Sequence, residues 1–332
     1  MILTILTDPI PYKKYFLKES LKRIIKLFLK KNNNLGINKH LSGHFSVTRS
    51  LINGLNELGV NYVYNPFLIT KVSDIVIVLS GINTLKQAIY LKKIGKIKFL
   101  FAGPNIITFV NDFDNIISSN FIDYVITPSE STSNLYINDN HILKNKCKAW
   151  PAGVDIKYWK PRFNKEKKKI LFYLKQHCFT DSYFKNKIVN IDQYVNYLNS
   201  KNYQTELIEY GKFTKETYLG LLQDSILMVG FSFSESQGIA WAEAWATDVP
   251  TLIYYNNISS VYERTFSCET APYLSPQTGQ YFNNFEDFTN KFNNWETNQI
   301  IFNPNNWVLK NMSDKISASK LLEIINLKTT FT

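Results

Sequence analysis

The sequence has 332 residues, of which 45% are hydrophobic and 20% are charged, and its formal net charge is +11. This length allows two domains with separate cores, and the hydrophobic share excludes an intrinsically disordered chain. No apolar run reaches the roughly 18 residues of a membrane-spanning helix, so no such helix is expected.

The first residues and the cysteines indicate the compartment. The charges near the N-terminus follow the first apolar residues instead of preceding them, which argues against a signal peptide. Cys147, Cys178 and Cys268 are far apart and form no C-x-x-C pair, so neither a disulfide framework nor a zinc site is predicted. We therefore expect a cytoplasmic protein.

The positive charge is concentrated in the first half of the chain. Residues 1–150 contain 19 Lys and Arg against 9 Asp and Glu, a balance of +10, whereas residues 151–332 contain 19 against 18, a balance of +1. A basic surface attracts acidic partners, so we expect the first half to face an anionic molecule or surface.

The first strand is predicted at residues 2–7, and a basic amphipathic helix follows at residues 12–31, from Tyr12 to Lys31. Apolar residues recur there at helical spacing, and lysines recur at every fourth position from Lys14 to Lys30. Such a helix can lie on the inner face of an anionic membrane as a peripheral contact. It can equally be a surface helix whose lysine face is solvated.

Strands and helices then alternate through the rest of the first half. Helices are predicted at residues 47–58, 84–94 and 128–137, and strands at residues 61–64, 74–79, 98–102 and 121–127. Gly43 and His44 are placed in a loop before the first of these helices. Alternation of this kind predicts a doubly wound parallel sheet.

A boundary is predicted at residues 149–161, which contain two prolines, a glycine and aromatic residues. Beyond it the alternation restarts. Strands are expected at residues 170–174, 204–210, 226–231 and 250–254, and helices at residues 191–198, 215–224, 238–246 and 313–325. The second half is therefore predicted to be a second α/β sheet.

The strongest local signal is residues 231–254, FSFSESQGIAWAEAWATDVPTLIY. A strand ends at Phe231, a polar loop follows, and Gly238 opens a helix whose free N–H groups are a natural seat for a diphosphate. Glu235 lies in the loop, and Glu243 lies on the helix after seven intervening residues. These acids could merely lie near the helix start and on a solvated helix face. Against that, Glu243 is flanked by Trp241, Ala242, Ala244 and Trp245, where a carboxylate is usually paired or functional.

This segment resembles the E-x7-E motif of retaining glycosyltransferases of the GT-B fold, of the family-4 (glycosyltransferase group 1) type. The stretch PAGVD at residues 151–155 is similar to the interdomain segment of that family, and residues 123–130 are similar to its last N-domain strand. The resemblance covers residues 120–255 well. It implies two Rossmann-like doubly wound domains facing a cleft, with residues 1–150 binding the acceptor and residues 151–310 binding a nucleotide-sugar. A final helix within residues 311–332 would pack back on the first domain.

The resemblance also implies roles for single residues. Glu235 would contact the donor sugar, Glu243 the ribose, and the backbone amides of Ser236, Gln237 and Gly238 the sugar and phosphates. Lys175, after the first strand of the second domain, would stabilise charge on the departing diphosphate. Gly211 and Lys212, after a later strand, would line the base, while Gly43 would act in place of a glycine-rich loop and His44 near the sugar.

No histidine cluster and no acidic triplet predicts a bound metal, so metal-independent, retaining transfer is expected. No cofactor is predicted beyond the donor substrate, a UDP- or GDP-sugar. The implied product is a surface glycan or glycolipid, from a glycan or lipid-linked acceptor and by a hexosyltransferase-type enzyme.

Three alternatives stay open. One is a nucleotide-sugar epimerase of the same fold, which would need further acids and a histidine. Another is a basic nucleic-acid-binding protein, although no binding motif appears and no nucleic acid is expected as a partner. The last is a non-catalytic scaffold that binds a membrane or another partner.

Overall fold

The computed structural model describes residues 2–8, 43–162, 168–175, 189–261 and 264–329. The predicted helix at residues 12–31 and Cys178 lie outside them. The chain divides into two compact units. Unit 1 comprises Met1–Gly153 with Ser317–Thr332, and unit 2 comprises Val154–Ile316. Among the described helices, none combines the length and the apolar composition required to cross a bilayer.

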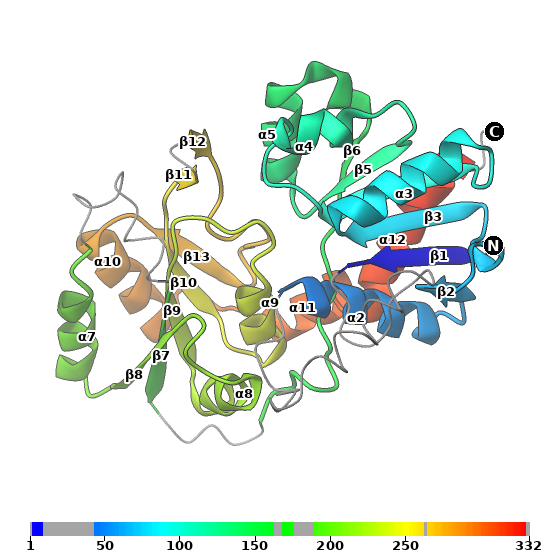
Figure 1. Cartoon of the computed structure of the whole chain (residues 1–332). Coiled ribbons are helices and arrows are strands. Elements are labelled where there is room, and N and C mark those ends of the chain that lie inside the picture. Colours follow the sequence, from blue (N-terminus) through cyan, green and yellow to red (C-terminus); the bar gives the residue numbers. More distant parts are fainter. Residues whose placement is uncertain (1, 9–42, 163–167, 176–188, 262–263, 330–332) are drawn as a thin grey trace, which may run out of the picture. The chain divides into compact units, whose positions relative to one another are not determined.

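Unit 1 is built on a six-stranded parallel sheet in the order β2-β1-β3-β4-β5-β6 (Figure 1). Its strands are β1 Leu3–Thr7, β2 Tyr62–Tyr64, β3 Ile75–Ser80, β4 Phe99–Asn105, β5 Tyr124–Thr127 and β6 Cys147–Ala149. The last five residues of β3 are buried, as expected for a β-branched strand covered on both faces. Sequence patterns missed β6, which has only three residues.

Helices cover this sheet on both faces, as the alternation predicted. They are α2 Gly43–Glu57, α3 Ile82–Lys93, α4 Asp112–Asn115 and α5 Glu130–Asp139, with 3₁₀ turns at Ile69–Lys71, Ile116–Ser118 and His141–Asn145. The final helix, α12 Asp314–Thr329, contributes Ala318, Leu321 and Ile325, which are fully buried. The indole N–H of Trp150 donates to the Ser317 carbonyl at 2.8 Å, and this bond anchors the helix.

The start of α2 corrects one prediction. The loop predicted to hold Gly43 and His44 is in fact the first turn of the helix, which begins at Gly43 rather than Val47. The Thr48 hydroxyl donates to the His44 carbonyl at 3.1 Å, one turn back along the helix. No proline or further glycine separates Gly43 from Val47, so nothing in this stretch ends the helix earlier.

Unit 2 is built on a five-stranded parallel sheet in the order β13-β10-β9-β7-β8. Its strands are β7 Lys169–Leu174, β8 Gln204–Glu209, β9 Leu227–Phe231, β10 Thr251–Tyr254 and β13 Gly279–Phe282. A separate antiparallel pair consists of β11 Ile258–Val261 and β12 Arg264–Ser267. The helices are α7 Ile191–Ser200, α8 Lys215–Asp224, α9 Ile239–Ala246, α10 Phe285–Glu296 and α11 Pro304–Asn311.

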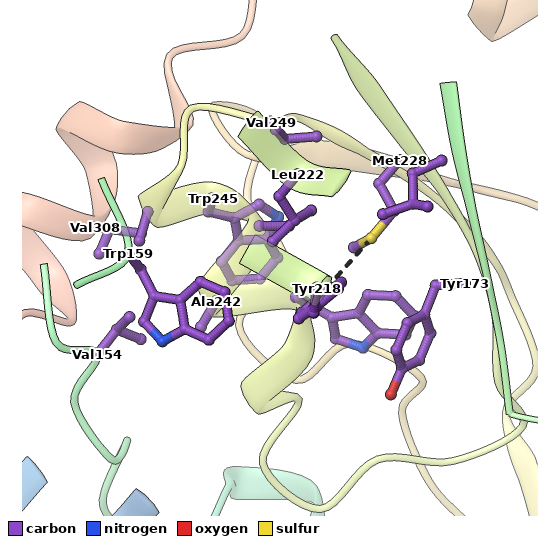
Figure 2. Close-up of a cluster of buried hydrophobic side chains, with 14 of the residues drawn as sticks. Val154, Trp159, Tyr173, Tyr218, Leu222, Met228, Ala242, Trp245, Val249 and Val308 are labelled. Atoms are coloured by element: carbon purple, nitrogen blue, oxygen red, sulfur yellow. Dashed lines mark hydrogen bonds between the residues drawn. The ribbon is translucent and has the colours of Figure 1, made fainter. Parts of the chain in front are cut away.

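The helices lie on the two faces of this sheet (Figure 1). Alternating side chains of β7 contact the two groups of helices. Phe172 packs with α7 and α10, whereas Tyr173 packs with α8 and α9 on the other face. Figure 2 shows the second of these cores, in which the hydroxyl of Tyr218 in α8 lies 3.5 Å from the sulfur of Met228 in β9. Both faces of the sheet are therefore covered by helices, and a functional site can form only at the ends of its strands.

Gly230 in β9 is required because the indole of Trp241 lies against it. A Cβ added at Gly230 would lie 2.6 Å from two ring atoms of Trp241. Trp241 in turn contacts Tyr173 with ring centroids 5.0 Å apart. The close approach of α9 to the sheet therefore depends on the absence of a side chain at position 230.

Substitution of this glycine should be costly, whereas the same change elsewhere should help. We expect Gly230→Ala to lower the free energy of unfolding by about 1–3 kcal/mol through overpacking. Gly220, inside α8, has nothing within 4 Å of an added Cβ, so Gly220→Ala should raise stability by roughly 0.5–1 kcal/mol. Urea unfolding followed by circular dichroism measures both, and equal effects of the two variants would contradict the packing described.

Candidate functional site

The carboxyl edge of the unit 2 sheet brings three loops together. Lys175 follows β7, Tyr210 to Lys212 follow β8, and Ser232 to Gln237 follow β9. β7 lies between β8 and β9, so the strand order changes direction at β7. In open parallel sheets, ligands bind outside the carboxyl ends of the strands at such a switch point.

The centre of this edge is an ion pair between Lys175 and Glu235. The Lys175 ammonium lies 2.8 Å from Oε1 of Glu235, and the two side chains are only 15% and 13% exposed. The Lys175 backbone N–H donates to the Phe231 carbonyl at 3.0 Å, which extends the pairing of β7 with β9 by one residue. The pair therefore follows from the order of the strands: neighbouring strands end side by side, and each supplies one charge.

Two further side chains stabilise the pair. The hydroxyl of Ser232 donates to Oε1 of Glu235 at 3.3 Å, and the ammonium of Lys175 lies 5.1 Å from the ring centroid of Tyr210. Hydrogen bonds and cation–π contacts of this kind offset part of the cost of removing charges from water.

The backbone of the loop is also held in place. The Glu235 N–H donates to the carbonyl of Glu269 at 3.0 Å, and the Asn256 amide donates to the carbonyl of Phe233 at 3.4 Å. Burial raises the pKa of the Glu269 carboxyl. The loop after β9 is thus fixed by the segments after β10 and β12, which lie well downstream in the sequence.

Gly238 starts α9 in a conformation that suits glycine. Its φ and ψ are 68° and 40°, in the left-handed region, and an added Cβ would lie 2.7 Å from Cδ1 of Trp241. The indole N–H of Trp241 donates to the carbonyl of Thr270 at 2.8 Å, and the hydroxyl of Tyr218 donates to the carbonyl of Ala240 at 2.8 Å. The helix start is therefore fixed at the sheet edge, where its first N–H groups have no partners within the helix.

Glu243 is half-buried on α9, among the buried residues Trp241, Ala242, Ala244 and Trp245. Burial, with further contributions from Glu243 and Glu235, raises the pKa of Tyr218 well above its usual value. Burial and the same two carboxylates also raise the pKa of Tyr173. The two acids of the motif are therefore near the same pair of phenols.

Gln237 is buried without hydrogen bonds. Its side chain is only 7% exposed, and within the part of the chain that the structure describes neither the oxygen nor the nitrogen of its amide has a partner. An unsatisfied buried amide is costly. It lies between Glu235 and the start of α9, so the site holds a donor and an acceptor that the folded chain does not use.

The other predicted site residues are placed as follows. Ser236 is exposed in the loop. Gly211 has a left-handed φ of 83°, and Lys212, whose side chain is 70% exposed, forms an ion pair with Glu209. Gly43 and His44 belong to unit 1, where His44 is exposed on the first turn of α2.

Sequence patterns missed three contributors to the site. Ser232 lies inside the quoted motif, and its place two residues after a buried core position was the available signal. Tyr210 follows β8, and no sequence pattern indicated its contact with Lys175. Glu269 contributes through its backbone from a segment 34 residues beyond Glu235, and no pattern marks it.

Within the described ranges, no group of three or more His, Cys, Asp or Glu side chains is arranged so that it could hold a metal ion. The sequence contains one D-x-D, at Asp112, Phe113 and Asp114 in unit 1. A carboxylate oxygen of Asp112 accepts the N–H groups of Thr108 and Phe109, at 3.0 and 2.9 Å, which is a local turn contact.

The chain was compared with known proteins. No protein-family model matches the sequence, and no curated protein matches it closely enough to count as a relative. The apo form of the lipopolysaccharide outer core galactosyltransferase WaaB matches with a TM-score of 0.56 at 11% identity, over 99% of this chain and 100% of that one. Sucrose-phosphate synthase from Thermosynechococcus elongatus matches with a TM-score of 0.52 at 10% identity, over 100% and 99%.

The N-terminal domain of trehalose-6-phosphate phosphatase from Candida albicans also matches, with a TM-score of 0.51 at 11% identity over 98% and 96% of the two chains. At these identities the similarity shows the fold alone. The predicted fold class is confirmed: two Rossmann-like parallel-sheet domains with the GT-B fold.

The unsatisfied amide of Gln237 leads to a stability prediction. We expect Gln237→Met, which keeps the shape and removes the polar atoms, to leave the melting temperature unchanged or to raise it. Asn256 is equally buried, at 7% exposure, but its amide donates to the carbonyl of Phe233, so Asn256→Leu should lower the melting temperature. Differential scanning calorimetry compares the two, and a marked loss of stability in Gln237→Met would show that its amide is satisfied.

Proposed function

We propose that the protein is a glycosyltransferase that takes a sugar from a nucleotide-sugar donor. The observation that carries the proposal is the Lys175–Glu235 pair at the switch point of the unit 2 sheet, beside the start of helix α9, which begins at Gly238 and carries Glu243. A nucleoside diphosphate sugar needs a seat for its phosphates, a partner for its ribose and groups for its sugar. This edge offers a group suited to each.

The roles follow from charge and position. The amides of Ser236, Gln237 and Gly238 and the start of α9 would receive the diphosphate. Glu243, further along the helix, would accept hydrogen bonds from the ribose hydroxyls. Glu235 would do the same for the hydroxyls of the donor sugar, which lies beyond the phosphates.

Lys175 would act on the leaving group. In the transfer, the bond between the anomeric carbon and the β-phosphate oxygen breaks, and the acceptor oxygen forms a bond to the same carbon. The proton of the acceptor hydroxyl passes to the departing β-phosphate oxygen, which lies on the same face of the sugar in a retaining reaction. Positive charge aimed at the developing phosphate charge typically lowers the barrier by about 3–4 kcal/mol.

The finer assignments belong to the same proposal. Lys175 and the α9 dipole would take the part of a metal ion, the donor would be a UDP- or GDP-sugar, and the transferred unit a hexose. Unit 1 would bind a glycan or lipid-linked acceptor, with Gly43 and His44 near the sugar, and Gly211 and Lys212 would line the base. The basic residues 12–31 would touch an anionic membrane, and the product would be a cell-surface polysaccharide or glycolipid. The galactosyltransferase named among the structural matches is in keeping with this class.

Calorimetric titration of nucleotides tests the donor site. UDP, GDP, ADP and CMP are titrated into the wild type, Glu243→Gln and the control Glu216→Gln, in EDTA; Glu216 is an exposed acid on α8. We expect one nucleoside diphosphate to saturate the wild type. Glu243→Gln should weaken its binding about tenfold or more, because hydrogen bonds to a charged partner contribute roughly 1.5–3 kcal/mol, and Glu216→Gln should leave it unchanged.

Two results would count against the proposal. If none of the four nucleotides binds, the chain has no nucleotide-sugar site. If one binds with equal affinity to all three proteins, the nucleotide lies away from α9, and the assignment of the donor site to Glu243 is wrong. Incubation of the preferred nucleotide-sugar then distinguishes transfer from epimerisation, since only transfer releases the nucleoside diphosphate.

A further inference from the structure

The amino edge of the unit 1 sheet, opposite the carboxyl ends of its strands, collects positive charge. The strands β4, β5 and β6 begin there, and the helices α3 and α12 end there because they run antiparallel to the strands. Seven lysines lie at these strand starts and helix ends. Lys98 is paired with Asp74, and the other six are here called the lysine edge: Lys92, Lys93, Lys96, Lys146, Lys148 and Lys328.

Four of these lysines contact Tyr124, at the start of β5, or the residues shortly before it. The ammonium groups of Lys148 and Lys328 lie 5.2 and 6.0 Å from the centroid of the Tyr124 ring. Lys92 forms an ion pair with Asp123, and Lys146 donates to the Ser119 carbonyl at 3.3 Å. Residues from α3, β6 and α12 thus converge, although more than 230 positions separate Lys92 from Lys328 in the sequence.

The carboxylates at this edge are already engaged. Asp123 accepts from Lys92 and from the Leu100 N–H, and Asp74, before β3, pairs with Lys98 at 2.9 Å. Burial lowers the pKa of Lys146, and Lys328 and Lys92 lower it further while Asp123 raises it. The lysines therefore repel one another, and an anionic partner would relieve that repulsion.

Exposed apolar side chains neighbour these lysines along the chain. Ile94 is 56% exposed, Phe121 is 37% exposed and Leu327 is 53% exposed. Each is within two positions of a lysine-edge residue or of Asp123 in the sequence. Lysines with interspersed aliphatic and aromatic side chains are the composition of surfaces that lie on anionic bilayers.

Helix electrostatics explain only part of this arrangement. Cations at helix C-termini are favourable, which accounts for Lys92 and Lys93 on α3 and for Lys328 on α12. Lys146 caps the C-terminus of the 3₁₀ turn His141–Asn145, whereas Lys148 lies within the strand β6, where no helix dipole accounts for it. The convergence of both groups on Tyr124 is what indicates a shared partner.

We propose that the lysine edge docks unit 1 on an anionic lipid bilayer, independently of residues 12–31 and of the donor site. The lysines supply the attraction to the headgroups, and Ile94, Phe121 and Leu327 enter the interface between headgroups and acyl chains. A nucleic acid fits less well, because it offers no partner for exposed aliphatic side chains and the edge contains lysines rather than the bidentate arginines that grip single phosphates.

Vesicle co-sedimentation of the full chain tests this surface. The vesicles contain either phosphatidylcholine alone or equal parts of phosphatidylcholine and phosphatidylglycerol. Lys148→Glu/Lys328→Glu is compared with Lys310→Glu/Lys315→Glu, an equal change of charge at two exposed lysines of unit 2. Lys18→Glu/Lys22→Glu provides the same change within residues 12–31, and thermal unfolding establishes that each variant is folded.

We expect the wild type to bind only the anionic vesicles, with binding that weakens as salt screens the charges. Lys148→Glu/Lys328→Glu should lower the partition coefficient by about tenfold or more, since each lysine near such a surface contributes roughly fivefold. The unit 2 pair should have little effect. Ile94→Ser/Leu327→Ser, which keeps every charge, should also weaken binding.

The proposal is overturned if the wild type ignores anionic vesicles or binds both kinds equally. It is also overturned if binding is lost in the variant of residues 12–31 but kept in the lysine-edge variant, or if all charge variants behave alike. Single-stranded DNA is the competitor: a lysine-edge variant that loses DNA binding but keeps vesicle binding would assign the surface to nucleic acid instead. None of these results depends on nucleotide binding.

Discussion

A carboxylate and an ammonium group, both nearly closed off from water, set the constraint on which the unit 2 site depends. Lys175 and Glu235 lose most of their hydration, so each needs the other at hydrogen-bond distance. That distance requires β7 and β9 to be neighbours, the loop after β9 to turn back over β7, and the loop backbone to be held. The strand order, the Ser232 hydroxyl and the bond from Glu235 N–H to the Glu269 carbonyl meet these requirements.

The packing beneath the loop serves the same constraint. Gly230 lets Trp241 lie flat against β9, and Trp241 ties α9 to the Thr270 carbonyl. The start of the helix is therefore set by the aromatic core, and the polar loop does not set it. One sheet edge then carries two carboxylates, one ammonium group and a helix N-terminus, and no additional helix or strand is inserted to bring them there. A buried pair of this kind adds little net stability, so stability alone does not account for it.

The sequence predicted the parts of the fold that are specified locally. Five strands that are rich in β-branched or apolar residues were predicted because such strands are buried on both faces of a sheet: β1, β3, β4, β7 and β9. Helix α8 spans the predicted residues because Thr214 caps its first turn. Elements that depend on distant partners were missed: β13 pairs with β10 across 27 residues, and the polar helix α10 is buried only through Phe288 and Phe292. In the site, the E-x7-E spacing located both acids, whereas the buried amide of Gln237 and the contact from Glu269 arise only in three dimensions.

A double-mutant cycle on the Lys175–Glu235 pair tests the central claim most directly, with stability and nucleotide-sugar affinity measured on the same proteins. We expect Lys175→Met and Glu235→Gln each to destabilise the fold, and the double variant to recover most of that loss through a coupling of about 0.5–3 kcal/mol. Affinity for the preferred nucleotide-sugar should stay low in all three variants. A double variant that binds the nucleotide-sugar like the wild type would show that the pair does not serve the donor, and a double variant less stable than either single variant would show that the two charges are not coupled.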